Sequence, residues 1–381
     1  MPHRILIISP TPTHPVNAGN RSRIFVYSKY LIELGHEVHF LYSDQEDADI
    51  TAMEQYWGNR FHHVSYKAPV RQEFNKYLKK FNSNYQYYSH IDDHYNELLD
   101  ARIAELKKQY DFSAVIIEYI FNTKAFFNFG NDVIKVVDTH DVMTDRHKHF
   151  LRAGKPAVWY STPKREEKKG IDRADYVMAI QDKEAAFYRK ITRKKVITVG
   201  HIVNVAVPES REVPRPRLLF VGSNNPNNFH AITDFLRDYF PLLRTHYPGL
   251  ECYMAGKICQ AFEDTEGLVK LGEVADLADA YRESDLVFNP LTIGTGLKIK
   301  MIEALGQGKP VISTTVGAEG LEEGEGKAFL IADTPEQFSR QLGRLLNEPG
   351  CYPAMVKNAL EFVRNYNIKH SNELIRLFNR D

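Results

Sequence analysis

Near the amino terminus lies the stretch RILIISPTPTHPVNAGNRSRIFVYSKYLIELGHEVHFLYS, from Arg4 to Ser43, which indicates the architecture of the chain. A short apolar run leads through a proline-rich loop to a second segment with apolar residues at helical spacing: Ile24, Tyr27, Leu31 and Leu34. Gly35 ends that pattern, and the apolar run HEVHFLYS follows. Strand, loop, helix and strand in this order predict a βαβ unit with a right-handed crossover and a parallel sheet. Since ligands bind beyond the carboxyl ends of such strands, the loop from Pro10 to Asn20 is expected to be functional.

Short β-branched runs alternate with helical segments over the rest of the chain, and the alternation stops once. Further runs before the interruption are SAVIIEY, VIKVVDTHD, ADYVMAIQ and KVITVGHI, and those after it include RLLFVGS, LECYMAG, LVKLGEV, LVFNPL, PVISTTV and AFLIA. Between them VNVAVPESREVPRPR gathers three prolines, which predicts an interdomain linker. We therefore predict an α/β fold of two Rossmann-like doubly wound domains, residues 1–205 and 206–361, with a helix over 362–381 packing back on the first.

Composition narrows the class of protein. A length of 381 residues favours two domains, and 49 basic against 49 acidic residues give a formal net charge of zero, which argues against a dedicated nucleic-acid binder. The 3 cysteines show no paired metal spacing and no disulfide framework, as is typical of a reducing compartment. The run ILIIS is too short for the core of a signal peptide, and no apolar run approaches the ~20 residues that span a bilayer. A cytoplasmic protein is expected.

The stretch PLTIGTGLKIKMIEALGQGKPVISTTVGAEGL, from Pro290 to Leu321, suggests an anion site. Its glycines permit a tight turn, and we expect Gly296 to begin a helix whose unpaired N–H groups favour a diphosphate. Lys298 in the first turn and Lys300 would neutralise phosphate charge, while Glu303 accepts hydrogen bonds from hydroxyls. The alternative is that Lys300 and Glu303 form an ordinary surface pair of a helix. The apolar neighbours of Glu303 favour a polar ligand or protein donor beside it.

A second candidate loop, FVGSNNPNN, ends the first predicted strand of the carboxyl-terminal half. Gly222 and Ser223 at this position could bring backbone N–H groups and a hydroxyl to a phosphate. The alternative is that the asparagines and the proline simply build turns, which is their commoner use.

Together, the glycine turn, Glu303, ALGQGKPVISTTVGAEGL and ADAYRESDLVFNPL resemble the donor domain of GT-B glycosyltransferases, specifically the retaining family four, or glycosyl transferases group 1. The resemblance implies a nucleotide-diphosphate sugar bound in a cleft between two domains, with Glu303 on the ribose hydroxyls. The family's first acidic position is Thr295 here, which departs from the pattern. The same resemblance puts Gly294, Thr295, Gly296 and Leu297 against the diphosphate and sugar.

The resemblance also assigns the remaining donor contacts. Lys298 and Lys300 would replace the basic residues that relatives carry in the first-strand loop, since GSNNPNN has none. The segment containing Gly272 and Val274 would recognise the base. No metal is expected: positive charge comes from the lysines and the helix terminus, and the DDH sequence at Asp92 is read more readily as a helix start.

In the amino-terminal half, NAGNRSRIF resembles the family's glycine loop, with Gly19 and Asn20 at the turn. VVDTHDV resembles its strand-end histidine, so His140 would reach the donor sugar near the reacting carbon, supported by Asp141 or Asp138. Without the resemblance, a histidine at a strand end is more often a capping or core residue. The family implies transfer with retention, the leaving phosphate helping to deprotonate the acceptor, in the assembly of cell-surface polysaccharides or glycoconjugates.

Two stretches that mix basic and aromatic residues are candidates for the acceptor side. They are YKAPVRQEFNKYLKKFNSNYQYYSH and RHKHFLRAGKPAVWYSTPKREEKKG. Each suits a membrane interface or a sugar-stacking surface, and each is equally consistent with a solvated helical face. We therefore expect a glycan or lipid-linked acceptor and peripheral membrane contact on the inner face.

Other classes of protein are alternatives to a glycosyltransferase. A nucleotide-sugar epimerase of the same architecture would need further carboxylates in the cleft, and a non-catalytic glycan-binding or scaffold relative is suggested by Thr295. A dinucleotide-dependent dehydrogenase is disfavoured, because no first-strand turn shows the G-x-G-x-x-G arrangement with a ribose-binding acid.

Overall fold

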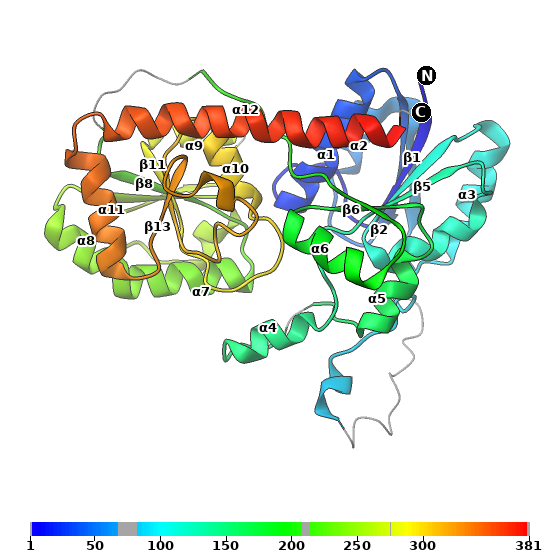
Figure 1. Ribbon diagram of the computed structural model, residues 1–381, viewed down its shortest axis with the longest axis horizontal. Helices are drawn as coiled ribbons and strands as arrows, with labels where there is room; N and C mark the ends of the chain where they lie inside the picture. The colour runs from blue at the N-terminus through cyan, green and yellow to red at the C-terminus, as the bar shows by residue number, and fades with distance from the viewer. Residues whose placement is uncertain (1, 68–81, 158, 208–213, 275, 379–381) are drawn as a thin grey trace. The chain divides into compact units, whose positions relative to one another are not determined.

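The chain divides into two compact units. A computed structural model describes residues 2–67, 82–157, 159–207, 214–274 and 276–378. The amino-terminal unit comprises Met1–Val16, Asn20–Gly200 and His370–Asp381, and the carboxyl-terminal unit comprises Asn17–Gly19 and His201–Lys369. Figure 1 shows each unit as a sheet with helices packed on it. In the described part of the chain no helix is both long and apolar enough to cross a bilayer.

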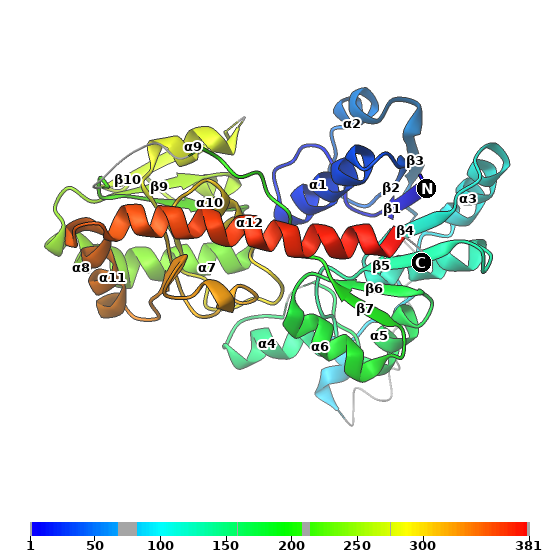
Figure 2. The ribbon, with the colours of Figure 1, turned by 45° about the horizontal axis from the view of Figure 1, so that its top comes forward.

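The amino-terminal unit is built on a parallel sheet of seven strands, seen in order in Figure 2. The strands in spatial order are β3 (Phe61–Ser65), β2 (Glu37–Asp44), β1 (Arg4–Ser9), β4 (Ala114–Glu118), β5 (Ile134–Asp138), β6 (Tyr176–Ala179) and β7 (Lys195–Thr198). Register pairs Glu118 of β4 with Asp138 of β5, so two carboxylates lie side by side at the carboxyl end of the sheet.

Helices cover both faces of this sheet. Alternate residues of β1 point to opposite faces: Ile5 and Ile7 pack with α1 (Gly19–Glu33), α2 (Ile50–Trp57) and the end of α12 (Cys351–Phe378). Leu6 and Ile8 pack on the other face with α3 (Leu98–Gln109), α5 (Lys164–Ile171) and α6 (Asp182–Ile191). The remaining helical segments of this unit are α4 (Arg146–Arg152), η1 (Gly58–Arg60), η3 (Ser83–Gln86) and η4 (Ile120–Asn128).

The carboxyl-terminal unit has a parallel sheet of six strands. Their spatial order is β10 (Leu268–Gly272), β9 (Glu251–Ala255), β8 (Arg217–Val221), β11 (Leu286–Asn289), β12 (Val311–Ser313) and β13 (Phe329–Ile331). The helical segments are α7 (Pro226–Asp234), η5 (Phe235–Tyr239), α8 (Phe240–His246), η6 (Lys257–Ala261), α9 (Leu277–Glu283), α10 (Ile299–Gly306), η7 (Glu322–Gly324), α11 (Pro335–Asn347) and the larger part of α12. A core of buried residues from β8, β9, β11, α8 and α11 fills one side of the sheet.

Both sheets reverse their strand order beside the first strand of the unit. The reversal lies between β1 and β4 in one sheet and between β8 and β11 in the other. Ligands of doubly wound sheets bind at such a switch point, beyond the carboxyl ends of the strands. The segments expected to bind a ligand are therefore the loop after β1, the ends of β4 and β5, the turn after β8 and the loop after β11.

The predicted α/β fold and the βαβ unit from Arg4 to Ser43 are confirmed. Sequence analysis did not anticipate β3, a five-residue edge strand that pairs with β2 alone. The helical segment AITDFLRDYFPLLRTHY is divided by a π-helical turn, Phe235–Tyr239, which lies just before Pro241. Proline cannot donate the backbone hydrogen bond of a regular helix, so local rearrangement is expected there.

Candidate active site

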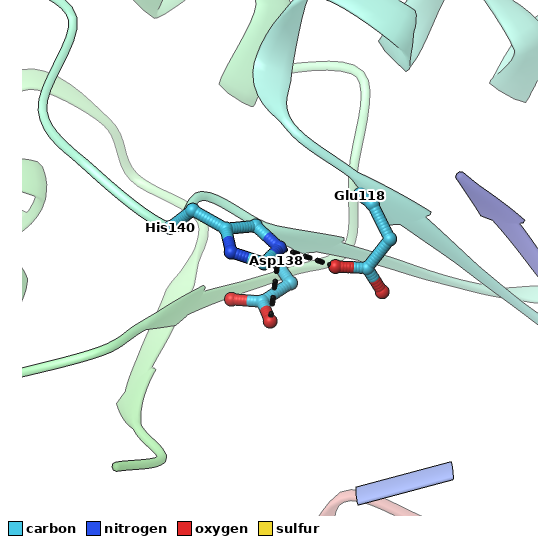
Figure 3. A group of neighbouring side chains, drawn as sticks. All are labelled: Glu118, Asp138 and His140. Atoms are coloured by element: carbon cyan, nitrogen blue, oxygen red, sulfur yellow. Dashed lines mark hydrogen bonds and ion pairs between the residues drawn. The ribbon is translucent and has the colours of Figure 1, made fainter. Parts of the chain in front are cut away.

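His140 lies in a buried cluster at the ends of β4 and β5 (Figure 3). Its Nε2 is 2.5 Å from Glu118 Oε2 and 3.7 Å from Asp138 Oδ2. The ring of Tyr119 stacks on the imidazole, with centroids 4.1 Å apart and planes inclined by 16°. Glu118 and Asp138 are fully buried, and 8% of His140 is exposed. The two strand ends therefore hold the imidazole between a carboxylate and an aromatic ring.

The backbone at these strand ends is unusual. Tyr119 has φ 65° and His140 has φ 58°, in the left-handed region that residues with a side chain seldom adopt. Such conformations cost on the order of 1–3 kcal/mol each and occur preferentially at active sites and ligand clamps. The stacking contact between the two residues places both strained positions in the same small cluster.

Charge in the cluster is balanced by Arg23 of α1. Its Nε and Nη2 donate to both carboxylate oxygens of Asp138, at 2.8 and 3.0 Å. Burial raises the pKa of Glu118 to about 7, although the hydrogen bond with His140 opposes the shift. Glu118 thus titrates near neutral pH, whereas Asp138 forms a buried bidentate ion pair.

The same three side chains have the spacing of a metal site. Single ligand atoms of Glu118, Asp138 and His140 lie within 4.8 Å of one another. Arg23, however, already uses both oxygens of Asp138. A cation bound here would lie beside the buried guanidinium of Arg23, and the repulsion between the two charges disfavours a divalent metal.

The loop after β1 reaches this cluster through Asn20. Asn20 Nδ2 donates to the hydroxyl of Tyr119 at 3.1 Å and to Thr11 Oγ1 at 3.4 Å. Helix α1 begins at Gly19, so Gly19 and Asn20, which were predicted to lie at a turn, are the first two residues of the helix. The structure thereby links one predicted loop residue to the ring that stacks on His140.

Of the two aspartates proposed to support His140, Asp138 lies in the cluster, and Asp141 Oδ2 accepts from Arg146 Nε at 3.1 Å. Sequence analysis missed Glu118, the shortest polar contact of the imidazole, and Arg23. A carboxylate at the end of the apolar strand SAVIIEY was the available signal for Glu118. Arg23 directly precedes the apolar positions of the first predicted helix, and its side chain is 2% exposed.

In the carboxyl-terminal unit, Lys300 is the basic side chain at the end of the first strand. Its Nζ donates to Asn228 Oδ1 at 2.9 Å and lies 3.9 Å from the centroid of the Phe220 ring in β8. Burial, followed by the nearby charge of Lys298, lowers the pKa of Lys300 to about 7, with Glu303 acting in the opposite direction. Among the described residues, no carboxylate oxygen lies within 4.0 Å of this amine. The site holds a desolvated cation with neutral partners.

Lys298 has a different environment. Its Nζ donates to the carbonyls of Gly296 at 2.7 Å and Gly294 at 3.4 Å, and it lies 3.8 Å from Glu319 Oε2. The expectation that a helix begins at Gly296 is wrong. Helix α10 begins at Ile299, and Lys298 is its N-cap residue. Gly294 and Gly296 have φ of 136° and 75°, which a right-handed helix excludes.

The rest of this loop is held by its own side chains. Leu297 is buried, Thr295 is partly buried, and the loop carbonyls converge on the Lys298 amine. Lys298 therefore orders the turn, and the loop presents Gly294, Thr295 and Gly296 in a fixed conformation.

Glu303 has the polar neighbour that its apolar context required. Its Oε1 lies 3.6 Å from Nε2 of the buried His201, and its side chain is 22% exposed. The buried hydroxyl of Tyr281 has no hydrogen-bond partner among the described residues. Burial, together with the negative charge of Glu303, raises the pKa of that hydroxyl well above its usual value. His201, at the start of the unit in sequence, was not anticipated as a site residue.

The turn after β8 uses its polar side chains internally. Asn225 caps α7 by accepting from the N–H of Asn228, and Asn228 Nδ2 donates to the carbonyl of Ser223 at 2.8 Å. The N–H of Gly222 donates to Ala255 at 3.0 Å. Through Asn228, the structure connects the Gly222–Ser223 turn directly to the Lys300 amine.

The segment proposed to recognise the base ends β10. Gly272 has φ 72°, and its carbonyl accepts from the N–H of Gly256 at 2.7 Å. Val274 follows the strand and is partly buried. These contacts explain why a glycine stands at 272, because the left-handed conformation there suits a residue without a side chain.

The two basic and aromatic stretches are only partly described. Arg71, Lys76, Tyr77, Lys79, Lys80 and Phe81 lie outside the described residues. Further along, Tyr87 stacks on His147 at 4.9 Å between centroids, and Tyr88 donates to Asp145. Asp92, considered as a weak metal ligand, instead accepts from Arg173 at 2.6 and 2.8 Å.

Part of the chain matches a described protein family. Residues 215–348 match the family described as "Glycosyl transferases group 1". A Klebsiella pneumoniae protein described as "Uncharacterized 44.6 kDa protein in cps region" is 23% identical, the match covering 96% of this chain and 97% of the relative.

Two solved structures show the same fold over the whole chain. Staphylococcus aureus TarM, in a complex with fondaparinux, alpha-GlcNAc-glycerol and UDP, has TM-score 0.69 and 13% identity over 99% of this chain and 100% of that one. The pneumococcal O-GlcNAc transferase GtfA, in complex with UDP and GlcNAc, has TM-score 0.66 and 11% identity over 99% and 100%. The chain therefore has the GT-B fold. Within the carboxyl-terminal unit, the matched segment is similar to the glycosyl transferases of group 1.

Proposed function

We propose that the protein transfers a sugar from a nucleotide-diphosphate sugar to a hydroxyl of a glycan or lipid-linked glycan, with retention of configuration. The observation that carries this proposal is the Lys300 amine, a partly buried basic group at the switch point of a donor-type domain with no described carboxylate within 4.0 Å. A diphosphate would supply the missing negative charge.

On the donor side, Lys300 binds the diphosphate, and Glu303 accepts hydrogen bonds from the ribose hydroxyls. Lys298 holds the Gly294–Leu297 loop against the phosphate and the sugar, a positioning role that follows from its bonds to the loop carbonyls. Beyond Gly222, whose N–H is used within the sheet, Ser223 adds a backbone N–H and a hydroxyl beside Lys300, and the segment of Gly272 and Val274 contacts the base. The developing charge of the leaving diphosphate is thus met by fixed donors, without a metal ion.

On the acceptor side, His140 acts on the transferred sugar, and Glu118 holds the imidazole by its Nε2. Transfer breaks the bond between the anomeric carbon and the diphosphate oxygen and forms a bond from the acceptor oxygen on the same face. The acceptor proton passes to the leaving phosphate. Support for UDP as the carrier comes from relatives solved with UDP, including HepE of Anabaena in complex with UDP-glucose.

We also propose a cytoplasmic location, with peripheral contact at the inner face of the membrane, and a role in polysaccharide assembly. The mixed basic and aromatic stretches support the membrane contact. Failure of the purified protein to bind anionic liposomes at low salt would remove that part of the proposal.

The experiment that tests the function is a panel of UDP-, GDP-, ADP- and dTDP-sugars, scored for binding and hydrolysis. Wild type is compared with Lys300→Gln and Glu303→Ala, and Lys327→Gln serves as a matched surface control. Selective turnover of one donor, weakened in both site variants and unchanged in the control, is expected. If no nucleotide bound, a glycan-binding protein without transferase activity would become the better explanation.

A further inference from the structure

A large exposed aromatic residue lies beside the His140 cluster. Trp159 is 59% exposed, whereas the chain's other tryptophan, Trp57, is 1% exposed and donates its N–H to Thr13. Trp159 has φ 63°, in the left-handed region, where a bulky side chain is an outlier. The fold therefore holds an indole at the surface in a conformation that the isolated chain disfavours.

The ring is supported from several sides by residues of the same unit. Tyr119 and Phe121 meet it edge to face, with centroids 5.7 and 6.3 Å away and planes at 82° and 86°. The guanidinium carbon of Arg146 lies 5.1 Å from the indole centroid and the same distance from Phe150. Arg146 is itself fixed by Asp141, at 3.1 Å. These contacts fix the indole within the unit, and much of its surface remains exposed.

The Trp159 indole lies close to the His140 cluster. Tyr119 touches both Trp159 and His140, so a single aromatic ring separates the exposed indole from the imidazole. Asp141 and Arg146 add a carboxylate and a guanidinium at the margin. An aromatic surface bordered by a few charged hydrogen-bonding groups suits a pyranose, which has an apolar C–H face and a rim of hydroxyls.

We propose that Trp159 is the stacking platform of an acceptor subsite that binds a sugar ring of the glycan, with Asp141 and Arg146 on its hydroxyls. This inference rests on the proposed function, because it makes His140 part of the transfer centre. A lipid surface is the competing occupant of an exposed tryptophan. Tyr119 contacts both Trp159 and His140, and this continuity with the His140 cluster favours the acceptor glycan as the occupant.

The test uses the full chain and three oligosaccharides, maltotetraose, cellotetraose and chitotetraose, with anionic phosphatidylglycerol vesicles as the alternative ligand. Because Trp57 is buried, a change in tryptophan emission that disappears in Trp159→Phe reports on Trp159. We expect a saturable blue shift with one tetraose and none with vesicles. A shift with vesicles alone would overturn the sugar subsite, and so would no response to any of the three.

Kinetics with the responding tetraose and the donor selected by the nucleotide-sugar panel complete the test. Trp159→Ala is expected to raise the acceptor KM about tenfold, with Trp159→Phe intermediate and donor hydrolysis without acceptor unchanged. An unchanged KM, or an equal loss of donor hydrolysis, would overturn the subsite. UDP binding by wild type, measured separately, distinguishes this outcome from failure of the transferase proposal itself.

Discussion

Binding of UDP is expected to protonate Lys300. The pKa of this amine is about 7 because of burial and the nearby charge of Lys298. At pH 8 only about one free chain in ten carries the proton. A diphosphate against the amine favours its charged form, so binding at pH 8 should take up about 0.9 proton. The apparent dissociation constant should accordingly be about fivefold higher at pH 8 than at pH 7, a range in which the terminal phosphate of UDP stays largely deprotonated.

Isothermal titration calorimetry of UDP at pH 8, in HEPES and in Tris, measures this uptake from the dependence of the enthalpy on the buffer. The terminal phosphate of UDP, with a pKa of about 6, is already deprotonated at that pH and adds little. Lys300→Arg should bind without proton uptake, because a guanidinium stays charged. Lys298→Gln removes a positive charge that lowers the pKa of Lys300, so its proton uptake should be smaller than that of wild type but not zero. Zero uptake by wild type, or the same uptake by Lys300→Gln, would refute the assignment of Lys300 to the phosphate.

Arg23→Met is expected to destabilise the amino-terminal unit by about 3–5 kcal/mol, because Asp138 is left buried without its partner; urea unfolding measures this, and a loss below about 1 kcal/mol would contradict it. The folded pKa of Glu118, about 7, exceeds the ordinary value of 4.5, so stability from its bound proton is lost as pH rises between these values. The unfolding free energy of wild type relative to Glu118→Gln should fall by up to about 3 kcal/mol over that range, and a flat difference would be inconsistent with the raised pKa. Donor hydrolysis is expected to survive EDTA, since Lys300 and backbone donors meet the phosphate charge; loss of activity that Mg²⁺ or Mn²⁺ restores would show this to be wrong.

Local pattern was sufficient for most of the fold. The apolar runs at β1, β2, β4 and β8 are short and bounded by loop residues, so periodicity and punctuation locate them. Such signals are weaker for β3, an edge strand of five residues with two histidines. The start of α10 was misplaced by three residues, because the sequence does not reveal that Gly294 and Gly296 adopt positive φ.

The candidate site was harder to predict because its partners come from distant segments. Arg23 and Asp138 are 115 residues apart, and Lys300 and Asn228 are 72 apart. Only the folded sheet brings such residues together. Arg23 lies in the helix after β1 and Asp138 ends β5, and these two strands are joined through β4. Sequence could propose His140 and Lys300 from motifs, but it could not select Glu118 over Asp141 as the contact of the imidazole.

The two clusters handle buried charge in opposite ways, and this difference indicates where the ligand must bring charge. In the amino-terminal unit, Arg23 neutralises Asp138, and the raised pKa of Glu118 removes the need for a second cation. In the carboxyl-terminal unit, the Lys300 amine has a neutral amide and an aromatic face as its described partners. An anionic ligand would relieve the second arrangement and strain the first. We therefore expect the diphosphate to bind at Lys300, and the group that meets His140 to be an uncharged part of the substrate, such as a sugar hydroxyl.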